Sequence, residues 1–483
     1  LTDHLGRIAG FLSEGDPSAA AREFFDFRVA DLAMGSGHFL VAAVDKIEAL
    51  MRTFLTEHSV PGVTEELLRL AAVARDALGT DDVAKSEVDE VGLLRRQVAR
   101  RCIYGLDINP MAVELARLAV WIHTFVPGLP MSNLDHGLVS ANSLTGIFGI
   151  DQALDALQPG RKPGHIMLFD EILMDQLASA RDLLIDVASA SEANKAEVEE
   201  GARMLAQARQ AADTSRRIFD AALAVQAGDL SPGMLPDEES LARLIQRDEV
   251  EAASADFKPA HMPYLFPEVF LRDKPGFDVL IGNPPWEKVR HEPQQFWVVR
   301  DPGLHSLPAA KRTERIAYLR ATRTVDRLEE LQAIAVSDRL TNYFSRAFHL
   351  QASQHYDLAK LFAERNLDLV RATGTVGLVM PQALLVLGGW KPIREVMVTD
   401  HHLVVAPLRN TGGWAFENVH PQTTMCVMTL GPGSGVTVWP ASSSEAAFSS
   451  LPETPQLELS VDDLRELSDE LNVPWFESPR DPL

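Results

Sequence analysis

The N-terminal part of the chain contains two short apolar runs, each ending in an aspartate and each followed by a helical pattern. The first run, 27–31, leads through a glycine-rich turn at 34–37 into a helical pattern from 38 to about 55. The second run, 102–107, is followed by a helix from 110 to about 123, because an Asn-Pro pair suits a first helical turn. This alternation predicts an α/β fold with a doubly wound sheet, whose ligands bind at the carboxyl ends of the strands.

The turn Met34-Gly35-Ser36-Gly37 is a candidate ligand loop. Glycines let the backbone approach a ligand closely, and the start of the following helix favours negative charge. Asp31 precedes the loop, and Asp107 at the end of the second strand could accept hydrogen bonds from ribose hydroxyls. The two acids are 76 residues apart (107 − 31) and the turn has no third glycine, which argues against the usual dinucleotide fingerprint. No Lys-Ser/Thr pair follows, which argues against phosphate cradling.

A rigid tetrapeptide, Asn283-Pro284-Pro285-Trp286, follows the apolar run 277–282. The prolines end strand pairing and stiffen the backbone, so an amide oxygen and a proline carbonyl stand as acceptors at the carboxyl edge of the sheet. Such a pair can bind an exocyclic amino group, and the tryptophan offers a flat face for a base. The alternative is a strand-ending turn with a core tryptophan, which the apolar strand before it makes the weaker interpretation.

Together these motifs resemble those of the large N6-adenine DNA methyltransferases of the gamma arrangement. The run Asp31-Leu32-Ala33-Met34-Gly35-Ser36-Gly37-His38-Phe39-Leu40 is similar to their methyl-donor motif, with leucine in place of the usual proline, and Asn-Pro-Pro-Trp is similar to their catalytic motif. Residues 102–116 and Ala141-Asn142-Ser143-Leu144 resemble their second and third motifs. The likeness covers about 1–150 and 262–430, and it is to type IIG restriction–modification enzymes and the methyltransferases of the BREX, phage-growth-limitation and DISARM systems.

The resemblance implies a Rossmann-like class I sheet that binds S-adenosylmethionine and needs no metal. Asp31 and the glycine turn would hold the amino-acid part of the donor, Asp107 its ribose hydroxyls, and Asn142 with Ile108 its adenine. The donor-binding residues predicted in this way are Asp31, Ala33, Gly35, Ser36, Gly37, Phe39, Asp107, Ile108, Asn142 and Ser143.

The resemblance also implies a mechanism in which an adenine is flipped out of the duplex, since its amino group cannot be reached inside the stack. The Asn283 side-chain oxygen and the Pro284 carbonyl would accept hydrogen bonds from the amino group and aim it at the donor methyl. Pro285 and Trp286 complete the catalytic motif, and Trp286 would stack on the base. A second stacking face is expected from His420, with Phe416 as the fallback. The expected function is site-specific DNA adenine-N6 methylation in a bacterial restriction–modification or phage-defence system.

The chain divides into a methyltransferase core and added segments. The core is expected at 1–150 and 262–435, with helical insertions at 151–261 and 288–350. The first insertion is Ala-, Glu- and Arg-rich, and its periodicity predicts a pair of long helices and a third beyond Pro232 and Pro236. Residues 436–483 are expected to form a loosely ordered tail with one short helix.

The net charge of −23, from 45 basic and 68 acidic residues, constrains how the chain meets DNA. Phosphate contacts need positive charge, so they must come from a local basic surface or from elsewhere. The candidate surface is Lys311, Arg312, Arg315, Arg320 and Arg323, and its alternative is a solvated helix face. Double-stranded DNA is the expected partner, with further defence-system proteins or a missing target-recognition domain supplying specificity. No apolar run approaches a membrane span and no signal pattern is present, so we expect a cytoplasmic location without membrane contact.

Two other interpretations remain open. Protein glutamine N5-methyltransferases share the glycine loop and an Asn-Pro-Pro-aromatic motif, but Trp286 and the long insertions argue against them. A non-catalytic subunit that binds the donor and scaffolds a defence complex is the second, because the motif that normally precedes the donor loop is not evident in 1–26.

Overall fold

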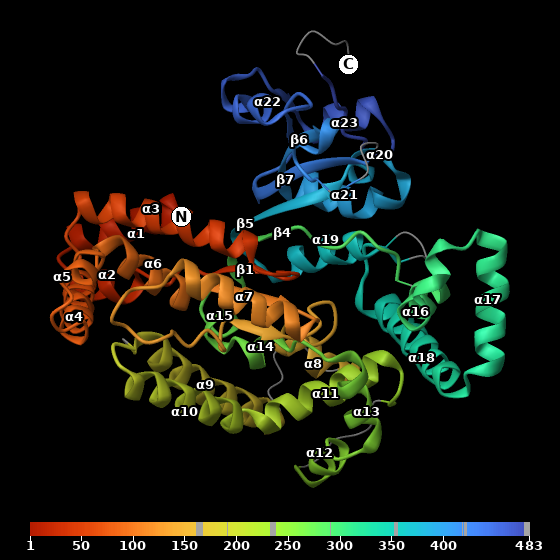
Figure 1. The fold of residues 1–483 in the computed structure, drawn as a ribbon, viewed down its shortest axis with the longest axis horizontal. Helices are drawn as coiled ribbons and strands as arrows, with labels where there is room; N and C mark the ends of the chain where they lie inside the picture. The colour runs from red at the N-terminus through yellow and green to blue at the C-terminus, as the bar shows by residue number, and fades with distance from the viewer. Residues whose placement is uncertain are drawn as a thin grey trace.

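The fold is built on one nine-stranded sheet, seen here in a computed structural model (Figure 1). The structure describes residues 1–160, 168–190, 192–231, 238–289, 291–351, 356–417, 419 and 423–477. The strand order is β3-β2-β1-β4-β5-β7-β6-β8-β9. The strands are β1 Val29–Asp31, β2 Ile103–Asp107, β3 Leu138–Ser140, β4 Phe277–Gly282, β5 Val370–Pro381, β6 His401–Arg409, β7 Thr424–Pro432, β8 Val436–Val438 and β9 Leu457–Leu459.

The first five strands of this order are parallel, and β7 runs antiparallel to both of its neighbours. The pairs β3–β2, β2–β1, β1–β4 and β4–β5 are parallel, whereas β5–β7 and β7–β6 are antiparallel. The carboxyl ends of β1, β2, β3 and β4 therefore meet at one edge of the sheet, which is the edge where both candidate motifs lie. The expected α/β class is confirmed.

Helices surround the sheet along the whole chain. Those that follow the two motif strands are α3 His38–Glu57 and α7 Pro110–His123. The other helices outside the two insertions are α1 Thr2–Ser13, α2 Pro17–Glu23, α4 Pro61–Ala77, α5 Asp82–Ser86, α6 Glu90–Arg101, α8 Ile150–Leu157, α14 Met262–Leu265, α15 Pro267–Phe270, α19 Leu358–Leu369, α20 Ala383–Val386, α21 Lys391–Thr399, α22 Glu445–Ser449 and α23 Val461–Leu467, with short 3-10 turns at Gly388–Trp390, Thr411–Gly413 and Leu451–Glu453.

The two faces of the sheet belong to two separate hydrophobic cores. Val29 and Ile103 contribute to one core, whereas their neighbours Ala30 and Tyr104 contribute to the other, as the alternation of side chains along a strand requires. Helices α1 to α4, α6 and α7 pack on the first face, and helices α8, α14, α15, α19 and α21 pack on the second. Since both faces are buried, β1 and β2 are apolar up to the aspartates that end them.

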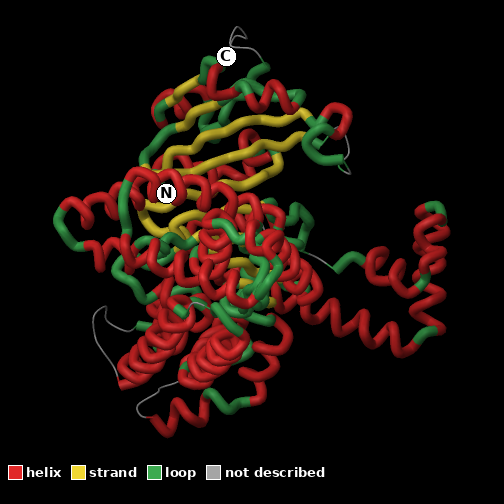
Figure 2. The backbone as a smooth tube through the Cα atoms, turned by 60° about the vertical axis from the view of Figure 1, so that its left-hand side comes forward, coloured by secondary structure: helices red, strands yellow, loops and turns green. Residues whose placement is uncertain are grey.

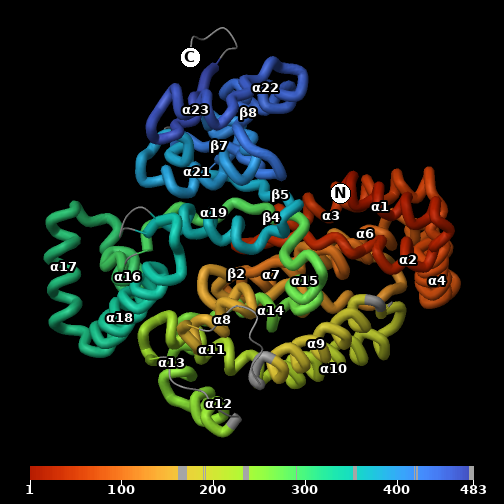
Figure 3. The backbone as a smooth tube through the Cα atoms, turned by 180° about the vertical axis from the view of Figure 1, so that it is seen from behind, coloured from red at the N-terminus to blue at the C-terminus, as the bar shows by residue number. Residues whose placement is uncertain are grey.

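The first insertion contains three long helices before the Pro-rich break, where the sequence predicted two. They are α9 Leu168–Ser189, α10 Lys195–Ala211 and α11 Asp213–Ala227, followed by α12 Glu238–Leu244 and α13 Asp248–Phe257. Only Ala212 separates α10 from α11 in an alanine-rich stretch, so neither glycine nor proline marks the turn. The helices pack on the second face of the sheet, and Figure 3 shows α9 and α10 side by side beneath it. Pro232 and Pro236 lie outside the described residues.

The second insertion forms an arm that projects away from the sheet (Figure 2). It consists of α16 Pro293–Arg300, a 3-10 turn at Pro302–Ser306, α17 Ala309–Thr322 and α18 Thr324–Ala347. The arm has a small hydrophobic core of its own, formed by Trp297, Leu304, Ile316 and Leu319. Only the C-terminal part of α18 packs into the hydrophobic core on the second face of the sheet, which is the main core of the molecule.

The expected loosely ordered tail is not observed between 436 and 477. Strand β8 pairs in parallel with β6, and β9 pairs with β8 in antiparallel orientation. Val436, Val438, Leu464 and Val473 are fully buried in the main core. The expected short helix is observed as α23. The expectation of loose order was wrong because strands of three residues show no periodicity in sequence, and their apolar residues are spread among Pro, Ser and Glu. Residues 478–483 lie outside the described part. Among the described residues, none of the helices has the length and apolar character needed to cross a bilayer.

Candidate functional site

A cleft of about 570 Å³ opens at the carboxyl edge of the sheet. The segments that follow β1, β2, β3 and β4 line one part of it, and α18 and α19 line the rest. The lining residues are Leu32, Ala33, Asp107, Ile108, Ala141, Asn142, Ser143, Leu144, Asn283, Pro285, Lys288, Val289, Ala333, Val336, Ser337, Leu340, Phe344, Leu358 and Phe362. Its size and mainly apolar lining with a few polar groups suit a small-molecule site.

Asp107 joins the first two strand ends. Its Oδ2 accepts a hydrogen bond from the Gly35 N–H at 3.0 Å, and its Oδ1 accepts one from the Asn109 N–H at 2.8 Å. Asp107 therefore holds the glycine turn against the start of α7 and presents its carboxylate at the cleft. Gly37 has φ +84°, and a Cβ there would lie 3.1 Å from that of Ala116, so a side chain would be strained at this turn.

Asp31 is a buried acid at the end of β1. Its Oδ1 accepts a hydrogen bond from the Ala33 N–H at 2.9 Å. Burial raises the pKa of this carboxyl to about 7, and the neighbouring Asp107 charge acts in the same direction, while the Ala33 N–H opposes the shift. On β4, a Cβ at Gly282 would lie 2.8 Å from Asp31 Oδ1, so glycine leaves room for the carboxylate.

The loop after β3 is held by segments far away in sequence. The Asn142 N–H donates to the Lys258 carbonyl at 2.8 Å, at the end of α13, and the Asn142 side-chain oxygen accepts from the Leu144 N–H at 3.1 Å. The Ser143 hydroxyl donates to the Leu32 carbonyl at 2.6 Å, directly beside the glycine turn. Ser143 therefore ties the third motif to the first, and the insertion fixes the backbone of Asn142.

The tetrapeptide after β4 places its residues in different environments. Asn283 and Pro285 are exposed and line the cleft, and the Asn283 side chain makes no hydrogen bond to any residue that the structure describes. Pro284 is buried. Trp286 is half-buried against the main core and does not line the cleft, and its buried Nε1 has no hydrogen-bond partner among the described residues. A free amide at the cleft is the feature that the proposed chemistry requires.

The cleft thus brings together seven of the predicted residues: Ala33, Asp107, Ile108, Asn142, Ser143, Asn283 and Pro285. The predicted residues that do not line it are Asp31, Gly35, Ser36, Gly37, Phe39, Pro284, Trp286 and Phe416. Asp31, Pro284 and Trp286 lie directly beside lining residues in sequence, so the strand ends place both motifs at one site.

The predicted second stacking face lies in the β6–β7 loop. Since β6 runs parallel to β5, and β5 to β4, this loop follows β6 at the same edge as Asn283. The side chain of the buried Asn410 binds the backbone of Phe416. Its oxygen accepts a hydrogen bond from the Phe416 N–H at 3.1 Å, and its nitrogen donates one to the Phe416 carbonyl at 2.8 Å. His420 lies outside the described residues, and the role of both aromatic groups stays a prediction.

Sequence reasoning missed the part of the cleft that α18 and α19 supply. The segment 288–350 was expected to be an added helical insertion whose basic residues could contact DNA phosphates, and none of its residues was assigned to donor binding. The apolar residues of α18 recur at helical spacing, which indicates a buried face but not what covers it. Only the tertiary contacts identify that face as part of the cleft.

The predicted basic surface lies on α17 and the start of α18, where most of its arginines have partners within the arm. Arg315 pairs with Asp301 at 2.8 Å, and Arg320 pairs with the buried Glu330 at 2.7 Å. Arg312 donates to the Gln294 side chain and Arg323 to the Arg300 carbonyl. These contacts stabilise the arm, and a role of Lys311 and its neighbours in phosphate binding stays a prediction.

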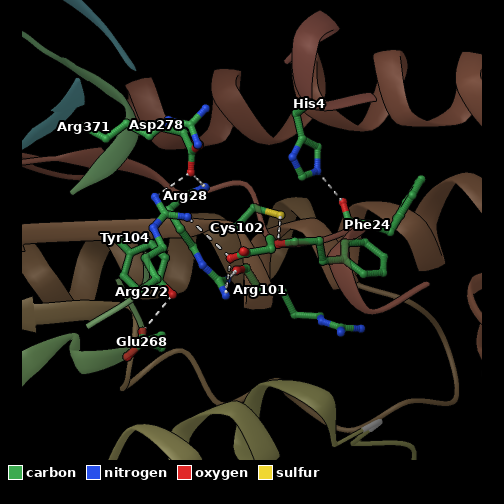
Figure 4. A network of polar contacts seen from close by, with 12 residues as sticks. His4, Phe24, Arg28, Arg101, Cys102, Tyr104, Glu268, Arg272, Asp278 and Arg371 are labelled. Atoms are coloured by element: carbon green, nitrogen blue, oxygen red, sulfur yellow. Dashed lines mark hydrogen bonds and ion pairs between the residues drawn. The ribbon is translucent and has the colours of Figure 1, made fainter. Parts of the chain in front are cut away.

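The opposite edge of the sheet contains a buried polar network that fixes β4 (Figure 4). Asp278, at the amino end of β4, accepts hydrogen bonds from the Arg28 N–H at 2.8 Å and from Arg272 at 3.0 Å, and it also pairs with Arg371. Its side chain is fully buried, so these partners are needed to compensate for its desolvation. The network locks β4 beside β1 and thereby sets the position of Asn283 at the other end.

Comparison with known proteins identifies the class of the central segment. Residues 101–302 match the family model of the Eco57I restriction-modification methylase. This confirms the resemblance to restriction–modification methyltransferases and supports a DNA methyltransferase. The matched range includes Asp107, Asn142 and Asn283, three of the polar residues that line the cleft. No curated protein sequence matches the chain.

Solved structures show only distant likeness. A nuclease-deletion mutant of the Type ISP restriction-modification enzyme LlaGI, in complex with a DNA substrate mimic, has 9% identity and a TM-score of 0.34 over 91% of this chain and 24% of its own. A modification subunit of a putative type I restriction enzyme from Vibrio vulnificus YJ016 has 12% identity and a TM-score of 0.24 over 83% of this chain and 93% of its own. The DrdV–DNA complex has 10% identity and a TM-score of 0.26 over 89% of this chain and 46% of its own. The chain therefore spans about a quarter of LlaGI, and these TM-scores are too low to assign a function.

Proposed function

We propose that the chain transfers a methyl group from S-adenosylmethionine to N6 of an adenine flipped out of duplex DNA. The observation that carries this proposal is one cleft that is lined by the carboxylate of Asp107, by Asn142 and by the exposed amide of Asn283. The strand order β3-β2-β1-β4-β5-β7-β6, with β7 antiparallel, supports a Rossmann-like class I methyltransferase core.

The residues present fit the methyl donor. Asp107 presents a carboxylate that can accept both ribose hydroxyls, and the glycine turn beside it leaves no side chain in the way. The exposed Ile108 and the loop of Asn142 would frame the adenine. Asp31 is buried directly before the lining residues Leu32 and Ala33, and its carboxylate would attract the positively charged donor from there. When bound, S-adenosylmethionine supplies an electrophilic methyl group on a sulfonium.

Asn283 and Pro284 would position the acceptor. The Asn283 side-chain oxygen and the Pro284 carbonyl accept hydrogen bonds from the adenine amino group and direct its lone pair toward the donor methyl. The rate enhancement then comes from positioning and from preorganised acceptors, without a covalent enzyme intermediate. Trp286 and an aromatic group of the β6–β7 loop, Phe416 or His420, would stack on the flipped base.

Double-stranded DNA is the proposed substrate, in a restriction–modification or phage-defence system of the bacterial cytoplasm. Because the net charge of the chain is −23, phosphate contacts require locally positive charge, and we assign them to the local basic surface. We assign sequence recognition to a further domain or partner protein.

Methyl transfer from radiolabelled S-adenosylmethionine to mixed duplex DNA tests the proposal. We expect label in DNA, recovered after digestion to nucleosides as N6-methyl-2′-deoxyadenosine by mass spectrometry. Label in protein glutamine amides would instead show a glutamine N5-methyltransferase. Donor binding without transfer to either substrate, across a random-sequence duplex library, would show a non-catalytic subunit.

Donor binding should depend on pH through Asp31. The pKa of this carboxyl is raised to about 7, so the free protein holds a proton there below that pH. A cationic donor favours the ionised form, so binding expels the proton and the dissociation constant falls as pH rises toward 7, by up to about tenfold per unit. Calorimetric titrations between about pH 5.5 and 8 measure this slope, and Asp31→Asn should remove it. An unchanged slope in the variant would contradict the assignment.

A further inference from the structure

One face of α18 forms a wall of the proposed donor cleft, although this helix belongs to the second insertion. The wall consists of residues three or four positions apart, which places them on one side of the helix. They are Ala333, Val336, Ser337, Leu340 and Phe344. The same cleft contains Asp107, Ile108 and Asn142, so the insertion and the motif loops line one space.

Specific contacts fix α18 against the loop that carries Asn142. The Tyr343 hydroxyl, which is fully buried, donates to the Gly146 carbonyl at 3.1 Å. Gly146 has φ +120°, and a Cβ there would lie 2.5 Å from the Ala260 carbonyl oxygen, so this point of the loop packs closely on Ala260 and requires glycine. Tyr343 also packs on Phe257 at the end of α13, with ring centroids 5.8 Å apart.

The end of α13 holds the same loop from the other insertion. The Thr145 hydroxyl donates to the Phe257 carbonyl at 2.9 Å, and the Asn142 N–H donates to the Lys258 carbonyl at 2.8 Å. Arg339 of α18 pairs with Asp229 and Asp256 of the first insertion. The Asn142 loop, α13 and α18 are therefore one connected unit rather than a core with loosely attached helices.

The chemistry of the wall fits a nucleoside. Val336, Leu340 and Phe344 are apolar, and Ala333 and Ser337, one helical turn apart, are the small residues on the same face. Planar bases are buried well between apolar surfaces, and small residues leave a strip on which a ring can lie. We infer that α18 is the outer wall of the donor site, that Ser337 limits its width, and that Tyr343 positions the wall. This inference rests on the proposed function.

The test uses the full chain with Ser337→Trp and, as its matched control, Ala335→Trp, at an exposed position of the same helix that does not line the cleft. The indole at 337 would fill the strip, so we expect the dissociation constant of S-adenosylmethionine to rise at least roughly tenfold, while the Ala335→Trp variant stays within about twofold of the native chain. S-adenosylhomocysteine should respond in the same way, because it shares the nucleoside. Unchanged melting temperature and unchanged affinity for a DNA duplex would show that only the donor site is altered.

Tyr343→Phe provides a second measurement if the tryptophan variant does not fold. It removes only the hydroxyl and leaves the Gly146 carbonyl without its donor, so donor affinity should fall about fivefold, with KM for the donor raised and kcat retained. Native donor affinity in both Ser337→Trp and Tyr343→Phe would overturn the inference. A loss confined to DNA binding would also overturn it, because α18 would then face the flipped adenine of the DNA rather than the donor. If the native chain binds the donor and only Asp107→Ala loses it, the proposed function stands and this inference fails. If the native chain binds no donor, both fail.

Discussion

Replacement of Asn283 by alanine should abolish methyl transfer while donor binding is retained. Asn283 is exposed at the cleft, and its amide makes no hydrogen bond to the described residues that could hold the donor loops in place. Its loss should therefore leave the site folded and remove an acceptor that acts on the reacting amino group. Losing one preorganised group of this kind lowers kcat by roughly a hundredfold to a thousandfold.

The measurement is single-turnover methyl transfer to duplex DNA, beside a calorimetric titration with the donor. Asn283→Asp is the matched variant, because a carboxylate retains an acceptor oxygen at the same position and should keep more activity than alanine. Activity of the alanine variant within about twofold of the native chain would contradict the mechanism. A parallel loss of donor affinity would instead place Asn283 in the donor site.

Replacement of Asp107 by alanine should remove donor binding. Its carboxylate is the acceptor assigned to two ribose hydroxyls, and hydrogen bonds to a charged group contribute about 1.5–3 kcal/mol each, so affinity should fall at least roughly a hundredfold. The change also removes the hydrogen bond that Gly35 donates, which loosens the glycine turn.

Asp462→Ala is the control for loss of an acid. The Asp462 side chain is 88% exposed on α23 and pairs only with Arg465 among the described residues. Its replacement removes one negative charge, as Asp107→Ala does, at a residue that does not line the cleft. Calorimetry of both variants checks the prediction, and circular dichroism confirms that both are folded. Donor binding by Asp107→Ala at native affinity would show that another group holds the ribose or that the cleft serves another ligand.

The two motif regions and their strands could be predicted from sequence because their structure is decided locally. An apolar run that ends at Asp31 or Asp107, followed by glycines or by Asn-Pro, dictates a strand, a turn and a helix through backbone preferences alone. Parallel strands then place their carboxyl ends together, so the meeting of Asp107 and Asn283 in one cleft follows from the α/β class. The role of each residue in chemistry stays a prediction.

The rest of the site could not be predicted, because it depends on contacts between distant segments. The Lys258 carbonyl holds Asn142 across the first insertion, and Tyr343 of the second insertion reaches Gly146. Strands β8 and β9 were missed for the same reason, since three residues carry no periodicity and acquire strand structure only by pairing with β6.

The sequence by itself therefore determined where the sheet begins, where its loops open and which polar groups stand at its edge. The tertiary structure decided what closes the cleft: a helix that looked like a peripheral insertion supplies a wall of it. Neighbouring residues determine local backbone preferences, whereas the partner of the buried face of α18 depends on which surface of the folded chain lies against it.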